Sequence, residues 1–141
     1  MTKYENSLPI QLIKARDVAM QYFRPVLADN DLTEQQWRVL RVLESKGPTD
    51  FSTLSHETCI LSPSLTGIIS RLEKQGFVTK QKSPHDGRQF YIHITDKTQA
   101  LVEQLRPQIE QQYSALKKTF GEKKYQQLSQ LLTELIELQT K

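Results

Sequence analysis

The segment at residues 62–76, SPSLTGIISRLEKQG, constrains the fold most strongly because it marks both ends of a helix. Ser62 is a favourable N-cap, and Pro63 suits the first helical position. Gly76 is the residue type that most often follows the end of a helix. Four apolar residues between these ends recur at helical spacing: Leu65, Ile68, Ile69 and Leu72. The segment is therefore predicted to be an amphipathic helix with one apolar stripe.

Two short apolar segments after this helix are predicted to be strands. The first is FVTKQK, at residues 77–82, and the second is FYIHI, at residues 90–94. The polar connection between them, SPHDGRQ, is too long for a two-residue hairpin turn. We therefore expect a β-hairpin with a long, charged tip.

Two more helices are predicted before residue 62. In LTEQQW, Thr33 and Gln36 have the spacing of a capping box, and Leu32 and Trp37 have that of a hydrophobic staple. The Gly-Pro pair at residues 47–48 should end this helix. A short helix is expected over residues 51–58. Helices followed by a hairpin predict a winged helix-turn-helix, which we place at residues 33–94.

Further helices are expected on both sides of this region. One follows Ser7, and Pro25 should end or kink it. Thr95 should start a long helix through about Phe120, which Pro107 should bend. The last helix carries an apolar stripe that is too broad to leave in water. Its members are Leu128, Leu131, Leu132, Leu135 and Ile136, and the same helix also carries Tyr125 and Leu138.

The apolar share of the chain, 37%, is low for a core that one copy completes alone. Either the protein is largely helical with wide polar faces, or a partner completes part of its core. We expect a single 141-residue protomer, mainly α-helical with a small β-hairpin. The net charge of +3 permits nucleic acid as a partner without requiring it.

The number of cysteines and the length of the apolar runs indicate in which cellular compartment the protein works. Cys59 is the only cysteine, so no disulfide can form within the chain and a reducing compartment is expected. No apolar run is long enough to cross a bilayer. These features predict a cytoplasmic protein that has no membrane segment, and no cofactor is expected.

The polar face of the helix at residues 62–76 is a candidate DNA-binding surface. At about 100° per residue, small and polar side chains lie opposite the apolar stripe or flank that face. They are Ser62, Pro63, Ser64, Thr66, Gly67, Ser70, Arg71 and Lys74. Small residues let a backbone approach DNA closely, hydroxyls bond phosphates or bases, and arginine can contact guanine. The alternative is an ordinary solvated face, although a mid-helix glycine costs roughly 1 kcal/mol relative to alanine.

The tip of the hairpin supplies a second candidate DNA contact. Basic side chains lie along it, at Lys80, Lys82, His85 and Arg88. Arg88 is expected to enter the narrow minor groove, where negative potential is concentrated. Asp86 cannot favour phosphate, so we expect it to orient Arg88 or Arg71 through a charge-assisted hydrogen bond. The alternative is that Asp86 and Gly87 only form the turn.

Three motifs together resemble the MarR family of bacterial transcriptional regulators over nearly the full chain. They are LTEQQWRVL, LSPSLTGIISRLEKQGFV and DGRQFYIHIT. Asp86 and Arg88 match the family's Asp-x-Arg signature on the wing. Two positions depart from the family pattern: Ile94, where leucine is frequent, and Thr98, where glycine is frequent. Neither departure lies on the predicted DNA face.

The segments YFRPVLADNDLTEQQWR and CILSPSLTGI resemble a subgroup of this family that represses operons for aromatic catabolism. The resemblance implies a sequence-specific repressor that a hydroxyphenylacetate-type aromatic acid releases from double-stranded DNA. It also implies a homodimer joined by the first helix and the last two helices, so that residues 1–32 and 95–141 are dimerisation helices. A twofold dimer should bind a pseudo-palindromic operator with half-sites about 10 bp apart.

The resemblance further implies that small aromatic acids bind between the dimer helices and the winged domain. A carboxylate in an apolar crevice needs a cation, because an unpaired buried charge is very costly. The candidates are Arg16 for the carboxylate, Trp37 for stacking on the ring, and Arg38 or Arg41 for further charge, with Arg24 as a weaker choice.

Each of these residues also has a structural interpretation. Trp37 would then be part of the staple and the core, and Arg38 and Arg41 would be solvated or in contact with the dimer partner. Arg16 would pair with Asp17 or with an acid of the other protomer.

Three other functions are alternatives to a ligand-released repressor. Some family members sense oxidants through a thiol near the dimer interface, but Cys59 lies in the apolar run TCIL and is expected to be a small buried hydrophobe. An enzyme is not expected, because His56, His85 and His93 are scattered and no metal-ligand spacing, phosphate loop or serine elbow is present. The third alternative is a winged helix that contacts only proteins. The affinity of a DNA-binding protein for DNA falls steeply as the salt concentration rises, and this behaviour would be missing in such a winged helix.

Overall fold

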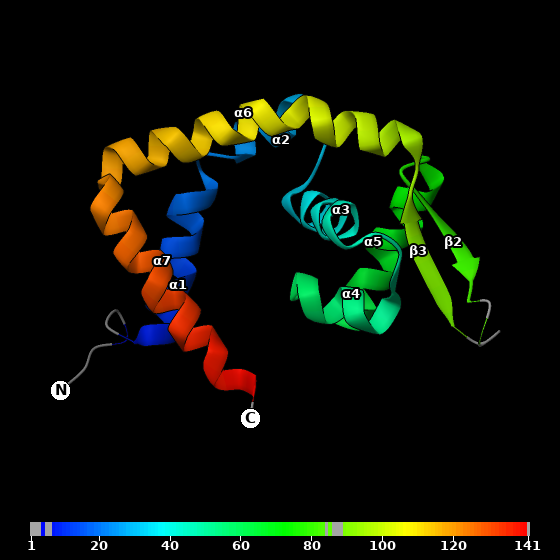
Figure 1. The fold of residues 1–141 in the computed structure, drawn as a ribbon, viewed down its shortest axis with the longest axis horizontal. Helices are drawn as coiled ribbons and strands as arrows, with labels where there is room; N and C mark the ends of the chain where they lie inside the picture. Colours follow the sequence, from blue (N-terminus) through cyan, green and yellow to red (C-terminus); the bar gives the residue numbers. More distant parts are fainter. Residues whose placement is uncertain (1–3, 5–6, 84, 86–88, 141) are drawn as a thin grey trace. The chain divides into compact units, whose positions relative to one another are not determined.

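The computed structural model describes residue 4 and residues 7–83, 85 and 89–140 (Figure 1). The helices are α1 (Leu8–Met20), α2 (Arg24–Asp29), α3 (Glu34–Lys46), α4 (Phe51–Thr58), α5 (Ser62–Lys74), α6 (Asp96–Phe120) and α7 (Glu122–Glu137), followed by the 3₁₀ helix η2 (Leu138–Thr140). The strands are β1 (Thr49–Asp50), β2 (Val78–Lys82) and β3 (Phe90–Ile94). The mainly helical fold with a small sheet that the sequence predicted is confirmed.

The chain forms two compact units. The winged unit comprises residues 24–107, and the helical unit comprises residues 1–23 and 108–141. Helix α6 contributes to both units, and Pro107 lies inside it without interrupting the helix. The winged unit contains the predicted winged helix-turn-helix.

The sheet of the winged unit has one strand more than the predicted hairpin. Its order is β1-β3-β2, and both pairs are antiparallel. Strand β1 pairs Thr49 with Ile92 and Asp50 with Tyr91. Two residues are too few to show the alternation by which a strand is recognised in sequence. The strand exists because the chain between α3 and α4 runs beside β3.

The core of the winged unit is formed by apolar side chains from all its main elements. Its fully buried members include Leu40, Leu43, Leu54, Leu65, Ile69, Leu72, Val78, Ile92, Val102 and Leu105. In Figure 1, α3, α4 and α5 lie together beside the hairpin of β2 and β3. The predicted apolar stripe of α5 is confirmed, since each of its four residues is at most 2% exposed.

The start of α3 is fixed as the sequence predicted. The Thr33 hydroxyl accepts a hydrogen bond from the Gln36 backbone N–H at 3.0 Å, and the Gln36 side-chain oxygen accepts one from the Thr33 N–H at 3.1 Å. Gly47 ends the helix with a φ of +81°, a conformation that glycine adopts without strain. The capping box and the glycine stop are both confirmed.

One predicted helix boundary is wrong, and another lies a few residues from its predicted place. Ser62 is the first helical residue of α5 rather than its N-cap, which is Leu61 in an extended conformation. The Leu61 carbonyl already accepts the hydrogen bond from the Leu65 N–H at 2.9 Å. The first helix ends at Met20, ahead of Pro25, which lies in the first turn of α2, where a missing N–H costs nothing.

The start of α6 explains one departure from the family pattern. Thr98 is fully buried, and its hydroxyl donates a hydrogen bond to the Phe77 carbonyl at 2.6 Å. The Thr95 hydroxyl donates to the Gly76 carbonyl at 2.8 Å. These bonds hold α6 to the turn between α5 and β2, a tie that glycine at position 98 could not make.

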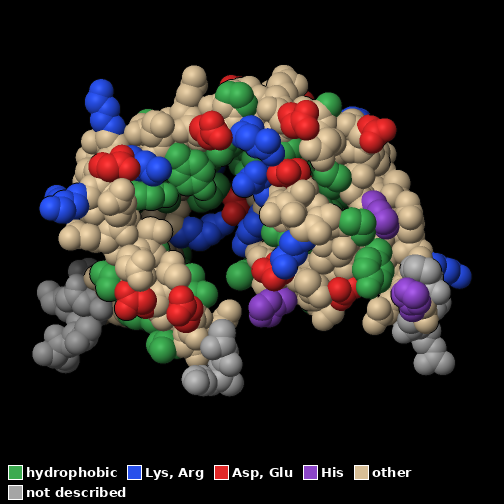
Figure 2. Space-filling model, in the orientation of Figure 1, with side chains coloured by type: hydrophobic (Ala, Val, Ile, Leu, Met, Phe, Trp, Pro, Cys, Tyr) green, Lys and Arg blue, Asp and Glu red, His purple; other side chains and the backbone are tan. Residues whose placement is uncertain are grey.

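The helical unit leaves many apolar side chains exposed. Among the described residues, neither α1 nor α7 contains a buried side chain. The exposed apolar residues of this unit include Leu8, Leu12, Ile13, Val18, Leu128, Leu131, Leu135, Ile136 and Leu138. Figure 2 shows hydrophobic side chains at the surface over α1 and α7. One internal contact is the pair of Phe23 and Tyr113, whose ring centroids lie 4.7 Å apart.

Candidate nucleic-acid interface

Helix α5 presents its polar residues on one outward face. Its buried stripe faces the core of the winged unit, and the candidate DNA-contacting side chains lie on the opposite side. Ser62, Pro63, Ser64, Thr66, Arg71 and Lys74 are exposed, and Gly67 and Ser70 are half-buried. The structure therefore brings all eight residues predicted on this helix together as one surface.

Gly67 lowers the surface of α5 at the centre of this face. A Cβ at this position would meet only the guanidinium of Arg71, at 3.8 and 4.0 Å from its two terminal nitrogens. These are ordinary van der Waals distances, so packing within the described protein does not require glycine here. The roughly 1 kcal/mol that glycine costs in a helix is consistent with a face that another molecule approaches closely.

The hairpin lies beside α5 and adds two described lysines. Lys80 and Lys82 are exposed on β2, and the Lys80 ammonium lies 3.9 Å from the Glu73 carboxylate of α5. His85 is exposed, and its backbone N–H donates a hydrogen bond to the Ser83 hydroxyl at 3.2 Å. The predicted contacts Asp86 and Arg88 lie outside the described residues.

A cavity of about 470 Å³ opens between α5 and the sheet. Its lining includes Thr66 of α5, Lys80 of β2, Phe90 and Ile92 of β3, and Asp50 of β1, the residue that caps α4. Hydrogen bonds from the side chain and the backbone N–H of Thr53 hold the pKa of the Asp50 carboxyl below its usual value. The sequence carries no signal for this cavity, because residues from five elements form it.

The prediction that Cys59 is buried is wrong. Cys59 is exposed and ends α4 in the left-handed region, with a φ of +58°. Its neighbours Thr58 and Ile60 are buried instead. The run TCIL is apolar, but the turn between α4 and α5 directs alternate side chains inward and outward.

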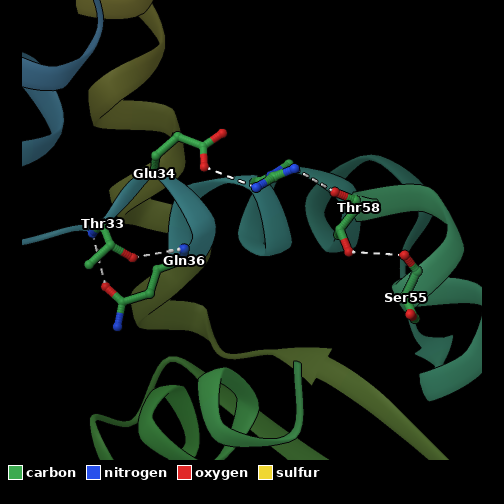
Figure 3. Close-up of polar contacts among 6 residues, drawn as sticks. Thr33, Glu34, Gln36, Ser55 and Thr58 are labelled. Carbon is green, nitrogen blue, oxygen red and sulfur yellow. Dashed lines mark hydrogen bonds and ion pairs between the residues drawn. The ribbon is translucent and has the colours of Figure 1, made fainter. Parts of the chain in front are cut away.

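Arg38 has a structural role that the sequence did not indicate. One terminal nitrogen donates a hydrogen bond to the Thr58 carbonyl at 2.9 Å, and the other pairs with the Glu34 carboxylate at 3.0 Å. Figure 3 draws these contacts between α3 and α4, together with the capping box. The Arg38 Nε is buried and has no hydrogen-bond partner among the described residues. Arg38 thus joins α3 to the end of α4.

Trp37 and Arg41 lie side by side one turn apart on α3. The Arg41 guanidinium carbon is 5.9 Å from the centre of the Trp37 ring. Glu44 pairs with Arg41 at 3.5 Å and with Arg106 at 3.2 Å. Because Arg41 is about half exposed, its ion pair contributes little to stability. An aromatic ring and an exchangeable cation therefore occupy one surface of the winged unit.

The other predicted cations lie elsewhere on the chain. Arg16 is exposed on α1 of the helical unit, and Arg24 is exposed at the start of α2 in the winged unit. Their roles toward a ligand stay predictions.

Metal-binding clusters and membrane-spanning helices are absent from the part of the chain that the structure describes. Within it, no cluster of three histidine, cysteine, aspartate or glutamate side chains is arranged to hold a metal ion. No described helix combines the length and the apolar character that spanning a membrane requires.

Comparison with known proteins agrees with this geometry. The model of the MarR family matches residues 32–90. The homoprotocatechuate degradative operon repressor of Escherichia coli is 45% identical over 94% of this chain and 90% of that protein. The transcriptional regulator FarR of Neisseria gonorrhoeae is 40% identical over 94% of this chain and 91% of that protein. The crystal structure of NadR with 4-hydroxyphenylacetate covers 96% of each chain, at 38% identity and a TM-score of 0.81.

Proposed function

This chain belongs to the MarR family of transcriptional regulators, and from that premise we propose that it represses an operon for aromatic-acid breakdown and is released by a hydroxyphenylacetate-type acid. It is a DNA-binding regulator rather than an enzyme. The observation that carries the proposal is the 45% identity to a repressor of such an operon over 94% of the chain. We place its action in the cytoplasm, where operator DNA is found.

In this proposal α5 enters the major groove. Its small residues permit close approach, Ser70 and Arg71 contact base edges, and Lys74 contacts phosphate. Lys80 and Lys82 of β2 add phosphate contacts beside the helix. On the wing, Arg88 enters the minor groove and Asp86 orients an arginine. The outward face of α5 and the lack of an internal packing reason for Gly67 support this arrangement.

We further propose that two copies associate through the helical unit. MarR regulators act as dimers, and this unit leaves the apolar faces of α1 and α7 exposed. Covering such faces is the main favourable contribution to association. A twofold dimer would present two α5 helices to half-sites about 10 bp apart in a pseudo-palindromic operator.

For the effector we propose the surface formed by Trp37 and Arg41. NadR, a related structure, holds 4-hydroxyphenylacetate. An aromatic acid needs a ring to stack on and a cation for its carboxylate, and α3 presents both within 5.9 Å. Arg41 can exchange the weak pair with Glu44 for the ligand. Arg38 is already held by Glu34 and Thr58, so we rank it below Arg41, and Arg16 stays as a second proposed cation.

Release follows if the effector binds the DNA-incompetent state more tightly than the competent one. A difference of ~3 kcal/mol between the two states would weaken operator binding roughly a hundredfold.

The test is operator binding with a panel of hydroxylated phenylacetates, benzoates and cinnamates, measured by fluorescence anisotropy on the neighbouring intergenic DNA. We expect 4-hydroxyphenylacetate to release the DNA, and Arg41→Ala to bind operator but to lose this response. Arg16→Ala is measured in parallel to test the second cation. Lys46→Ala is the control, because Lys46 is another exposed cation of α3 that pairs with Glu57. Release from Arg41→Ala at the wild-type effector concentration would exclude this site.

A second candidate function is oxidant sensing, which the exposure of Cys59 favours. Peroxide should then release operator DNA from the wild type but not from Cys59→Ser. Equal behaviour of the two proteins would exclude it.

A further inference from the structure

Leu61 is the most exposed large apolar side chain among the described residues, at 79%. Only one other described residue of the winged unit, Phe90, belongs to this exposed class, while the rest lie in the helical unit. Leu61 immediately precedes α5, and the small residues Ser62, Pro63 and Ser64 follow it at the exposed start of the helix. Its side chain therefore projects from the end of the helix that we propose enters DNA.

Helix formation does not explain leucine at this position. Leu61 is the N-cap of α5, and it has no polar side chain with which to bond the first N–H groups of the helix. Leucine ranks far below serine, threonine, aspartate and asparagine as an N-cap. Core packing does not explain it either, because the residue that packs into the core here is the adjacent Ile60, whose side chain is only 4% exposed.

The turn that carries Leu61 is held from both sides. The Ser55 hydroxyl donates a hydrogen bond to the Ile60 carbonyl at 2.6 Å, and the Ile60 N–H donates to the Ser55 carbonyl at 3.3 Å. On the other side, the Leu61 carbonyl accepts the first hydrogen bond of α5, from Leu65, at 2.9 Å. The backbone at Leu61 is thus ordered before any partner binds, which lowers the entropic cost of a contact there.

We propose that Leu61 is a specificity-determining residue that packs against the C5-methyl group of a thymine in the major groove of the operator. The residues at the N-terminus of a recognition helix are the ones that reach base edges. Thymine is the base that presents a methyl group there, and apolar side chains are what recognise it. This inference rests on the proposed DNA-binding role of α5 and adds a contact that hydrogen-bonding side chains cannot make.

The test replaces single thymines by uracil, a change that removes only the methyl group. Operator sequences are first selected from random duplexes with the wild-type protein. Each thymine is then exchanged in turn, and binding is measured for the wild type and for Leu61→Ser. At one thymine per half-site, we expect uracil to weaken wild-type binding about threefold to fivefold, as loss of one buried methyl group does. The same exchange should leave Leu61→Ser unaffected.

Leu61→Ser also separates this role from a structural one. Serine is a better N-cap than leucine, so the melting temperature should rise by a few degrees while operator affinity falls. The control is Lys74→Ala, which should weaken binding to thymine and uracil duplexes equally, as loss of a phosphate contact does.

Three results would overturn the proposal. In the first, the wild type binds its operator tightly and no exchange of thymine for uracil changes the affinity. This result would exclude the methyl contact while leaving the proposed function intact. A shift of Leu61→Ser to monomer in light scattering would assign Leu61 to an interface between copies. Failure of the wild type to select any duplex would overturn the DNA-binding role together with the role of Leu61.

Discussion

The two units of this protein differ in whether their apolar side chains are buried or exposed. The winged unit buries most of its leucines, isoleucines and valines, with Leu40, Leu54 and Leu72 fully enclosed and Leu61 as the exposed exception. The helical unit has the exposed residues Ile13, Leu131 and others on helices with no buried side chain among those described. One unit has a core of its own, and the other has an apolar surface without a cover in a single copy.

This difference favours one of the two interpretations of the low apolar share, namely that a partner completes part of the core. The chain does not have too few apolar residues for one core; a large part of them lies where one copy cannot bury them. A partner that covers α1 and α7 would add the missing burial, and the stability of the helical unit would then depend on protein concentration. The winged unit should not share that dependence, since its core is complete.

The largest effect is expected from a cavity in the winged unit. Leu54 of α4 is fully buried, so Leu54→Ala should lower the free energy of unfolding by about 2–5 kcal/mol. Chemical denaturation at two protein concentrations measures it, and the loss should be the same at both. A loss of less than 1 kcal/mol in the free energy of unfolding would mean that this core does not stabilise the winged unit.

The next effect is expected from a charge on the exposed face of α7. Leu131 is 63% exposed in one copy, so Leu131→Glu should leave each copy folded. Burying two unpaired carboxylates in a dimer should weaken association by about 3 kcal/mol, roughly a hundredfold. Sedimentation equilibrium measures the dissociation constant, with Leu131→Met as the conservative control. Unchanged dimerisation of Leu131→Glu would show that another face joins the copies.

A smaller effect is expected on DNA recognition by the winged unit. Arg71→Ala should cost about 1–3 kcal/mol in operator binding and much less on random DNA, because it removes a contact to a base. Ser70→Ala should reduce the same discrimination. Lys74→Ala should weaken both kinds of DNA alike. Anisotropy titrations on both duplexes separate these outcomes, and equal losses for Arg71→Ala on the two DNAs would exclude a role in base recognition.

The smallest effect concerns the cap of α4. Asp50 accepts a hydrogen bond from the Thr53 N–H at 3.1 Å, and its pKa is held below the usual 3.8. Because the folded pKa is lowered, its contribution to stability is complete above pH 3.8 and is lost as the pH falls through the folded value. Asp50→Ala should cost about 1 kcal/mol at neutral pH. The difference between the two proteins should shrink in acid, and a constant difference in pH-dependent denaturation would contradict this account.

The features predicted well from the sequence are those that neighbouring residues determine. The stripe of α5, the capping box of Thr33 and Gln36, and the stop at Gly47 all depend on contacts within one or two turns. The broad apolar stripe of the last helix was also visible, since it repeats along a single element.

The features that were missed depend on distant parts of the chain. Strand β1 exists only through β3, and Arg38 acts through the Thr58 carbonyl, 20 residues away. The exposure of Cys59 follows from its left-handed backbone, which no residue of TCIL indicates. The cavity beside α5 likewise gathers residues from five elements. For β1, Arg38 and the cavity, tertiary contacts decided what local pattern could not.

The most direct test of the central claim is sedimentation of the purified protein with a duplex that carries its operator, over a range of salt concentrations. The account predicts two copies per duplex, joined through the helical unit, and an affinity that falls steeply as salt rises. A protein that stays monomeric and does not associate with double-stranded DNA even at low ionic strength would contradict it.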